Sequence, residues 1–154
     1  MNPSTVVHST FTVERKITAI PERVFHAFAD ITAKEAWFAG PPEWALAEHA
    51  MDFRVGGQEI ERGGPPEGPA HTFVARYHEI VENQRIIYSY DMYVGETKLS
   101  VSLTTIELQA ESGGTRLTLT EQGAFLDGHE DPALREHGTK LLMDALAETF
   151  TSAP

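Results

Sequence analysis

Strand patterns follow one another through residues 46 to about 122 without a helix-length interruption, and this run constrains the fold most strongly. Short breaks of the kind found in hairpin turns divide it at Gly56-Gly57, Gly63-Gly64-Pro65-Pro66, Glu82-Asn83-Gln84, Gly95 and Gly113-Gly114. The breaks delimit six strands. Because strands joined by hairpins run antiparallel, this part of the chain predicts an antiparallel sheet with one buried face.

The residues before this run predict one strand and two short helices. Apolar and polar residues alternate over residues 10–17, as in a strand with one buried face. Pro21 occupies a position that the first turn of a helix accepts, and apolar residues recur at helical spacing from there to Asp30. Thr32 is then expected to cap a second short helix over residues 33–38.

The residues after the run predict a loop over residues 123–132 and then one long amphipathic helix. Its expected apolar stripe consists of Leu134, Gly138, Leu141, Leu142, Ala145, Leu146 and Thr149. The complete order predicts an α+β helix-grip fold, in which a curved antiparallel sheet of about seven strands (β-α-α-β6-α) wraps around the C-terminal helix. The 154 residues are expected to form a single domain over 1–154, with its core between about 11 and 150.

Composition limits the expected partners. The formal net charge is −11 and the 12 basic residues are scattered, so neither nucleic acid nor an anionic membrane surface is an expected partner. No apolar run approaches the roughly 20 residues that span a bilayer. The sequence has no cysteine and no signal-like segment at its N-terminus, and we therefore expect a cytoplasmic protein.

Several short motifs occur in a characteristic order along the chain. They are Pro21-Glu22-Arg23-Val24-Phe25, Trp37, Asp52-Phe53-Arg54-Val55-Gly56-Gly57, Glu79-Ile80-Val81-Glu82-Asn83-Gln84-Arg85-Ile86, Gly113-Gly114-Thr115-Arg116-Leu117-Thr118-Leu119, Gly123 and Gly138. Together they resemble the START-like (SRPBCC) superfamily, and within it the branch similar to the C-terminal domain of the activator of heat shock protein 90 ATPase. The resemblance runs from about Phe11 to Phe150 and implies the same helix-grip fold.

The resemblance leaves the activity open, because the superfamily spans lipid and hormone carriers, aromatic cyclases and members without assigned chemistry. One position departs from the family. Relatives often carry a tryptophan directly after the glycine of the last helix, whereas this chain has Thr139 after Gly138. A smaller side chain there is expected to enlarge or wet that end of a cavity.

We expect a mainly apolar cavity between the sheet and the C-terminal helix, since one helix does not always fill a concave sheet. The residues expected to bind a ligand there are Trp37, Phe53, Phe73, Tyr88, Tyr90, Met92, Ser102, Thr104, Leu119, Met143 and Leu146. The large apolar ones would equally serve as a packed core, and Trp37 in particular is expected to plug it. Ser102 and Thr104 would leave volume and supply donors if the strand register turns them inward.

Two charged residues stand on predicted apolar strand faces. Arg15 lies on the first strand and Glu121 on the last, and in this topology the two strands are neighbours, so a partly buried ion pair is expected. Alternatively, Glu121 anchors a polar ligand group or acts as a general acid or base, with Arg76 as a second catalytic candidate. Trp44, beside Gly40-Pro41-Pro42, is expected to act as a lid or as a dimer contact.

No metal or cofactor is expected. The acidic sequence Asp127-Gly128-His129-Glu130-Asp131 has no second ligand cluster at a matching spacing, and the remaining histidines are best explained as surface or satisfied residues. No Walker-type lysine occurs, and no glycine pattern opens a helix after a strand.

Three functions follow from these observations. The first is the binding of a small hydrophobic or aromatic molecule in the cavity, without catalysis. The second, implied by the resemblance, is a partner-binding protein like the chaperone ATPase activator. The third is a cyclase- or hydrolase-type enzyme that uses the same cavity. The sheet edges and the Trp44 region are also compatible with a homodimer.

Overall fold

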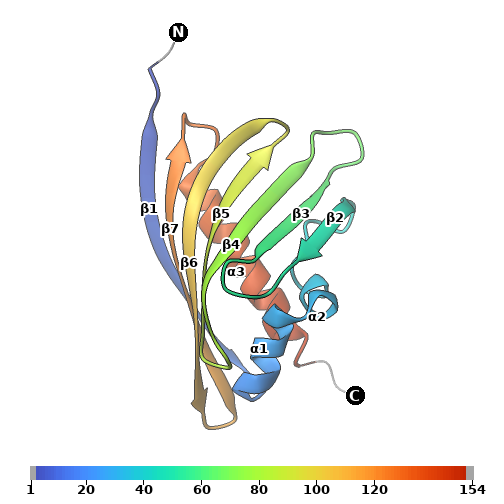
Figure 1. The fold of residues 1–154 in the computed structure, drawn as a ribbon, viewed down its shortest axis with the longest axis vertical. Helices are drawn as coiled ribbons and strands as arrows, with labels where there is room; N and C mark the ends of the chain where they lie inside the picture. Colours follow the sequence, from blue (N-terminus) through green and yellow to red (C-terminus); the bar gives the residue numbers. More distant parts are fainter. Residues whose placement is uncertain (1–2, 152–154) are drawn as a thin grey trace.

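A computed structural model describes residues 3–151 and places them in one seven-stranded antiparallel sheet and three helices (Figure 1). The strands are β1 (Val6–Ile17), β2 (Ala45–Met51), β3 (Gln58–Gly64), β4 (His71–Val81), β5 (Arg85–Val94), β6 (Thr97–Glu111) and β7 (Gly114–Leu126). The helices are α1 (Pro21–Ala29), α2 (Ile31–Glu35) and α3 (Pro132–Glu148). The predicted α+β helix-grip fold is confirmed.

The strand order is β1-β7-β6-β5-β4-β3-β2, so every neighbouring pair except β1 and β7 is consecutive in the chain. Pairing of the first strand with the last confirms that they are neighbours. Figure 1 shows α3 crossing one face of the curved sheet, with α1 and α2 gathered at one end. Within residues 3–151, no helix combines the length and apolar character needed to cross a membrane.

The cross-strand register aligns the concave-face side chains in rows. One row runs through His49, Glu61, Phe73, Met92, Ser100 and Phe125. The next runs through Glu59, Ala75, Tyr90, Ser102 and Gly123. Ser102 and Thr104 are both buried, which confirms that they face inward. Arg76 lies between the buried residues Ala75 and Tyr77 and is exposed on the opposite face.

The two short helices pack against one end of the sheet, and α1 contributes Val24, Phe25 and Phe28 to the hydrophobic core there. Pro21 begins α1, and Asp30 caps α2 by accepting a hydrogen bond from the Ala33 amide at 2.9 Å, so the expected cap at Thr32 was wrong. Trp37 is 5% exposed and donates its indole N–H to the Ala27 carbonyl at 3.0 Å. Its ring is therefore a core plug, as expected.

Helix α3 buries a different stripe from the one predicted. Its buried residues are Arg135, Thr139, Met143 and Leu146, whereas Leu134 and Leu141 are 66% and 55% exposed. The prediction was wrong at the two leucines because hydrophobicity alone assigned the inner face, and Gly138 and Thr149 of the predicted stripe are exposed as well. The helix instead turns two polar residues toward the sheet, where Arg135 finds hydrogen-bond partners. Thr139, the position that departs from the family, lies in this buried stripe.

Candidate functional site

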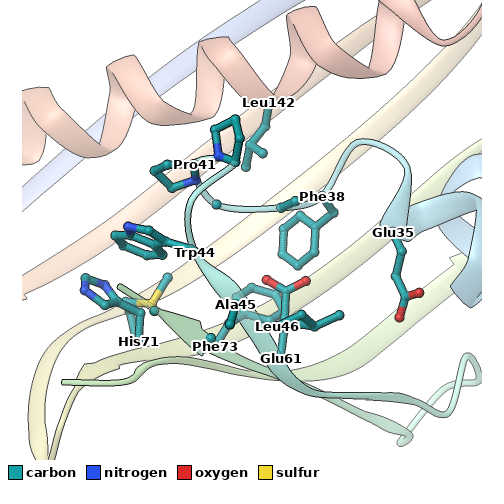
Figure 2. Close-up of a pocket in the computed structure, with 16 residues that line it drawn as sticks. Glu35, Phe38, Pro41, Trp44, Ala45, Leu46, Glu61, His71, Phe73 and Leu142 are labelled. Carbon is teal, nitrogen blue, oxygen red and sulfur yellow. The ribbon is translucent and has the colours of Figure 1, made fainter. Parts of the chain in front are cut away.

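A cavity of about 340 Å³ opens between the segment 38–46 and the strands β3, β4 and β5 (Figure 2). The segment contributes Phe38, Ala39, Gly40, Pro41, Pro42, Trp44, Ala45 and Leu46. The strands contribute Glu61, Gly63, Gly64, His71, Phe73 and Met92, while α2 adds Glu35 and α3 adds Leu142. Most of these groups are apolar or aromatic. The cavity therefore lies beside α3, on the side of the sheet that ends in β2.

Trp44 forms one wall of the cavity. It is half-buried, and its ring centroid lies 4.4 Å from that of His71. A Cβ atom added at Gly40 would lie 2.8 Å from the Trp44 ring, so glycine lets the chain pass close to the indole. The proline and glycine residues that end the α2 region thus also position this aromatic wall.

Phe38 and Phe73 form the aromatic floor. Their rings meet edge to face with centroids 5.0 Å apart, and the Phe38 ring also contacts Trp37 in the core. The Lys34 ammonium lies 4.5 Å from the centroid of Phe38. Edge-to-face pairs and cation–π contacts of this kind fix ring orientation. The floor is consequently built before any ligand enters.

A buried ionic cluster adjoins this floor. The Glu59 carboxylate accepts hydrogen bonds from Lys34 Nζ at 2.6 Å and from the Tyr77 hydroxyl at 2.6 Å. It also contacts His49 Nε2 at 2.8 Å, and His49 Nδ1 lies 2.8 Å from a Glu35 carboxylate oxygen. The cluster ties α2 to β2, β3 and β4.

The cluster shifts the proton affinities of its members. Burial favours the neutral form of Glu59, but the Lys34 charge and the hydrogen bonds it receives outweigh burial and hold the pKa of Glu59 below its usual value. Burial likewise opposes charge on His49, yet hydrogen bonds to Glu59 and Glu35 raise the pKa of His49 above its usual value. Both ring nitrogens of His49 can donate a hydrogen bond only when the imidazole is protonated, and the Glu59 and Glu35 carboxylates therefore favour the protonated ring.

Besides Glu35, Glu61 is the second acidic residue that lines the cavity. Figure 2 shows its side chain reaching toward Phe38. Within residues 3–151 its carboxylate has no hydrogen bond or ion pair, although His49 and Lys34 are near enough to act on it electrostatically. Burial raises the pKa of Glu61 to about 7, with the nearby Glu59 adding to the effect. The group therefore changes charge close to neutral pH.

A second polar cluster lies beneath the first turns of α3. The Glu121 carboxylate accepts hydrogen bonds from the Tyr90 hydroxyl at 2.7 Å and from Thr104 Oγ1 at 2.9 Å. Arg135 donates to the Tyr90 hydroxyl oxygen at 3.0 Å and to Ser100 Oγ at 2.9 Å, and it pairs with a glutamate of the preceding loop. Burial raises the pKa of Glu121 even though these contacts oppose the shift.

The expected ion pair between Arg15 and Glu121 does not form. Arg15 Nε lies 2.7 Å from an Asp144 carboxylate oxygen on α3. The register places Arg15 opposite Leu117 and Glu121 opposite Phe11, which separates the two charges along the paired strands. That prediction was therefore wrong: the strands are neighbours, but each charge finds its partner elsewhere.

The structure divides the residues expected to bind a ligand into three groups. Phe73 and Met92 line the cavity. Trp37, Phe53, Tyr88, Leu119, Met143 and Leu146 pack in or against the main hydrophobic core. Tyr90, Ser102 and Thr104 lie in or beside the cluster beneath α3, and within residues 3–151 the buried Ser102 hydroxyl has no hydrogen-bond partner. The catalytic candidates Glu121 and Arg76 do not line the cavity.

Sequence reasoning missed the groups that give the cavity its polar character. The sequence Gln58-Glu59-Ile60-Glu61-Arg62 alternates so that hydrophobicity would turn Ile60 inward, yet Glu59 is 1% exposed and shares the inner face with Glu61. The sequence signal that could have indicated this cluster was a pair of glutamates two residues apart on one strand, Glu59 and Glu61, together with the basic residues Lys34 and His49 earlier in the chain. Within residues 3–151, no group of three or more acidic or histidine side chains is arranged to hold a metal ion.

Comparisons with known proteins agree with this architecture. The family described as Activator of Hsp90 ATPase homolog 1-like protein matches residues 18–151. The structure of an uncharacterized protein from Rhizobium leguminosarum is 41% identical, with a TM-score of 0.92, over 97% of this chain and 99% of that chain. A crystallised protein from Rhizobium loti is 47% identical, with a TM-score of 0.87, over 94% of this chain and 98% of that chain. No curated protein matches the chain.

Proposed function

Because the chain belongs to the Activator of Hsp90 ATPase homolog 1-like family, whose members share a sheet curved around a helix, we propose that it binds a small, mainly apolar or aromatic molecule. The binding site is the cavity between the segment 38–46 and β3–β5. The observation that carries this proposal is the preformed cavity of about 340 Å³ with aromatic walls. Its volume falls within the roughly 300–1,000 Å³ range typical of small-molecule sites.

Burial supplies the driving force for such binding. A ligand that buries about 200 Å² of apolar surface gains roughly 5 kcal/mol, at about 25 cal/mol per Å². Part of this gain offsets the translational and rotational freedom lost on association. A gain of about 5 kcal/mol alone corresponds to a Kd of about 0.2 mM, so after this offset we expect neutral aromatic probes to bind in the millimolar range.

Titration calorimetry with naphthylmethanol tests the proposal. Leu142→Trp should fill the cavity and abolish binding, because Leu142 lines it. Leu141→Trp is the matched control, since its side chain is adjacent on the same helix but 55% exposed. Binding that is equal in wild type and both variants would place the ligand outside this cavity. Absence of binding by any apolar probe would refute the proposal.

A second candidate is a chaperone partner that stimulates an ATPase. It is supported by the description of the family and by two exposed leucines on one face of α3, Leu134 and Leu141. The test is the ATPase rate of a purified Hsp90 with and without this protein, compared with a Leu134→Glu, Leu141→Glu double variant. Stimulation that the double variant loses supports this candidate, and an unchanged rate counts against it. A cyclase- or hydrolase-type reaction lacks comparable support, because neither Glu121 nor Arg76 lines the cavity.

A further inference from the structure

The charges around the cavity floor do not balance. Three carboxylates, Glu35, Glu59 and Glu61, lie close together, and two basic groups, Lys34 and His49, lie among them. Lys34 is bonded to Glu59, and the two ring nitrogens of His49 are used by Glu59 and Glu35. Both basic groups of the cluster are thus hydrogen-bonded to Glu59 or Glu35, and Glu61 is the one carboxylate of the cluster without a basic partner in the described part of the chain.

No other lining residue supplies the missing positive charge. The segment 38–46 has no basic residue, and its one charged side chain is that of Glu43. Helix α3 contributes only Leu142 to the lining, and β4 contributes His71. Burial lowers the pKa of His71, although Glu130 opposes the shift, so this imidazole is neutral near pH 7. A cation at Glu61 must therefore come from outside the described chain.

The walls beside Glu61 suit a cation that carries an apolar body. The cross-strand register places Glu61 directly opposite Phe73, and Phe38 and Trp44 line the same space. The faces of aromatic rings attract ammonium groups, and the Lys34 ammonium already lies over the Phe38 ring. The cavity thus offers one carboxylate that is unpaired within the described residues, that of Glu61, together with aromatic surface, because the other lining carboxylate, Glu35, is bonded to His49.

We propose that the molecule bound here is an organic ammonium ion with an apolar or aromatic body, whose nitrogen donates a hydrogen bond to the Glu61 carboxylate. This inference rests on the proposed function and names its ligand class. The bound ammonium supplies the positive charge that the cluster lacks and stabilises the ionised form of Glu61. The aromatic body occupies the space between Phe38, Trp44 and Phe73.

A matched pair of probes isolates the charge. Naphthylmethylamine and naphthylmethanol have nearly the same shape, but only the amine is cationic at about pH 8. We expect wild type to bind the amine about tenfold more tightly than the alcohol, equivalent to about 1.4 kcal/mol. Glu61→Gln should lose this preference while still binding the alcohol. Glu107→Gln, a control on the exposed outer face of β6, should keep it.

Proton release supplies a second readout that needs no variant. Glu61 has a pKa of about 7, so at about pH 6 it is mostly protonated and must release a proton when the ammonium binds. Calorimetry in buffers of different ionisation enthalpy measures this proton. The nearby titratable groups are Lys34 and Glu35 on α2, His49 on β2, Glu59 on β3 and His71 on β4. Release by wild type that disappears in Glu61→Gln assigns the proton to Glu61.

The outcomes separate this inference from the proposed function. If neither probe binds, the proposed function fails. If the alcohol binds as tightly as the amine in wild type, the cavity stands and the ammonium inference is overturned. A preference for the amine that persists in Glu61→Gln, without proton release, also overturns it, because the charge would then be recognised elsewhere.

Discussion

His49 and Glu61 lie directly opposite each other on β2 and β3, yet His49 bonds to Glu59 and Glu35. Directly paired residues have Cβ atoms only about 5 Å apart, so an ion pair between them would be the simplest arrangement. His49 bonds to the diagonal residue Glu59 because the Glu59 carboxylate is deeply buried and needs several hydrogen-bond donors. This pairing has the consequence that Glu61 faces the cavity without a partner among residues 3–151.

Removal of Lys34 should strongly destabilise the protein. Lys34→Met leaves Glu59 buried without its main cation, which typically costs about 3–5 kcal/mol in the free energy of unfolding. Urea denaturation measures the loss. The control Lys140→Met breaks a half-exposed pair with Glu136 and should change stability by less than about 1 kcal/mol. Equal effects of the two substitutions would contradict the structural role of the cluster.

Stability should depend on pH through Glu61. Its folded-state pKa of about 7 lies above the ordinary value of 4.5, so the folded protein holds a proton that the unfolded chain has released. Wild type therefore loses stability relative to Glu61→Gln as the pH rises from about 4.5 to 7, and the difference is constant above that range.

The expected advantage of Glu61→Gln at about pH 8 is about 1–3 kcal/mol. Urea denaturation across this pH range measures it. Contributions from His49 and Glu59 are common to both proteins and largely cancel in the difference. Glu107→Gln should track wild type within about 0.5 kcal/mol at every pH. A Glu61→Gln curve parallel to that of wild type would rule out a raised pKa for Glu61.

Two inward-facing serines of β6, Ser100 and Ser102, should respond differently to substitution by alanine. Ser100 Oγ accepts a hydrogen bond from Arg135, so Ser100→Ala should lower the free energy of unfolding by about 1–3 kcal/mol. The buried Ser102 hydroxyl has no protein partner within residues 3–151, so Ser102→Ala should be neutral or stabilise by up to about 1 kcal/mol. Thermal denaturation compares the two. A large loss with Ser102→Ala would indicate a bound water at this hydroxyl.

Much of the fold follows from periodicity. On β5 the inward residues Tyr88, Tyr90 and Met92 are separated by the polar residues Ser89 and Asp91, and the turn signals separate the strands in order. Periodicity failed on β3 and α3 for one reason. Both elements turn charged or polar groups inward, and a hydrophobic pattern cannot indicate that a buried charge has partners on other elements. Glu59 needs Lys34, and Arg135 needs Tyr90, across many residues of sequence.

The position of the cavity was not predictable in the same way. It depends on the path of the segment 38–46, which packs Trp44 against His71 and has little regular secondary structure before β2. Apolar strand faces identified Phe73 and Met92, but the same rule selected Tyr88 and Leu119, which pack in or against the core. Sequence patterns distinguish inner from outer faces, whereas packed and hollow regions differ by the volume of side chains around them.

Methyl NMR of the methionine side chains tests the location of the binding site most directly. Met92 lines the cavity beside the segment 38–46, and Met143 is 2% exposed in the core beneath α3. On titration with naphthylmethanol, the Met92 methyl resonance should shift progressively and the Met143 resonance should stay in place. A shift of Met143 with Met92 unmoved would place the ligand beneath the helix and contradict the site proposed for this protein.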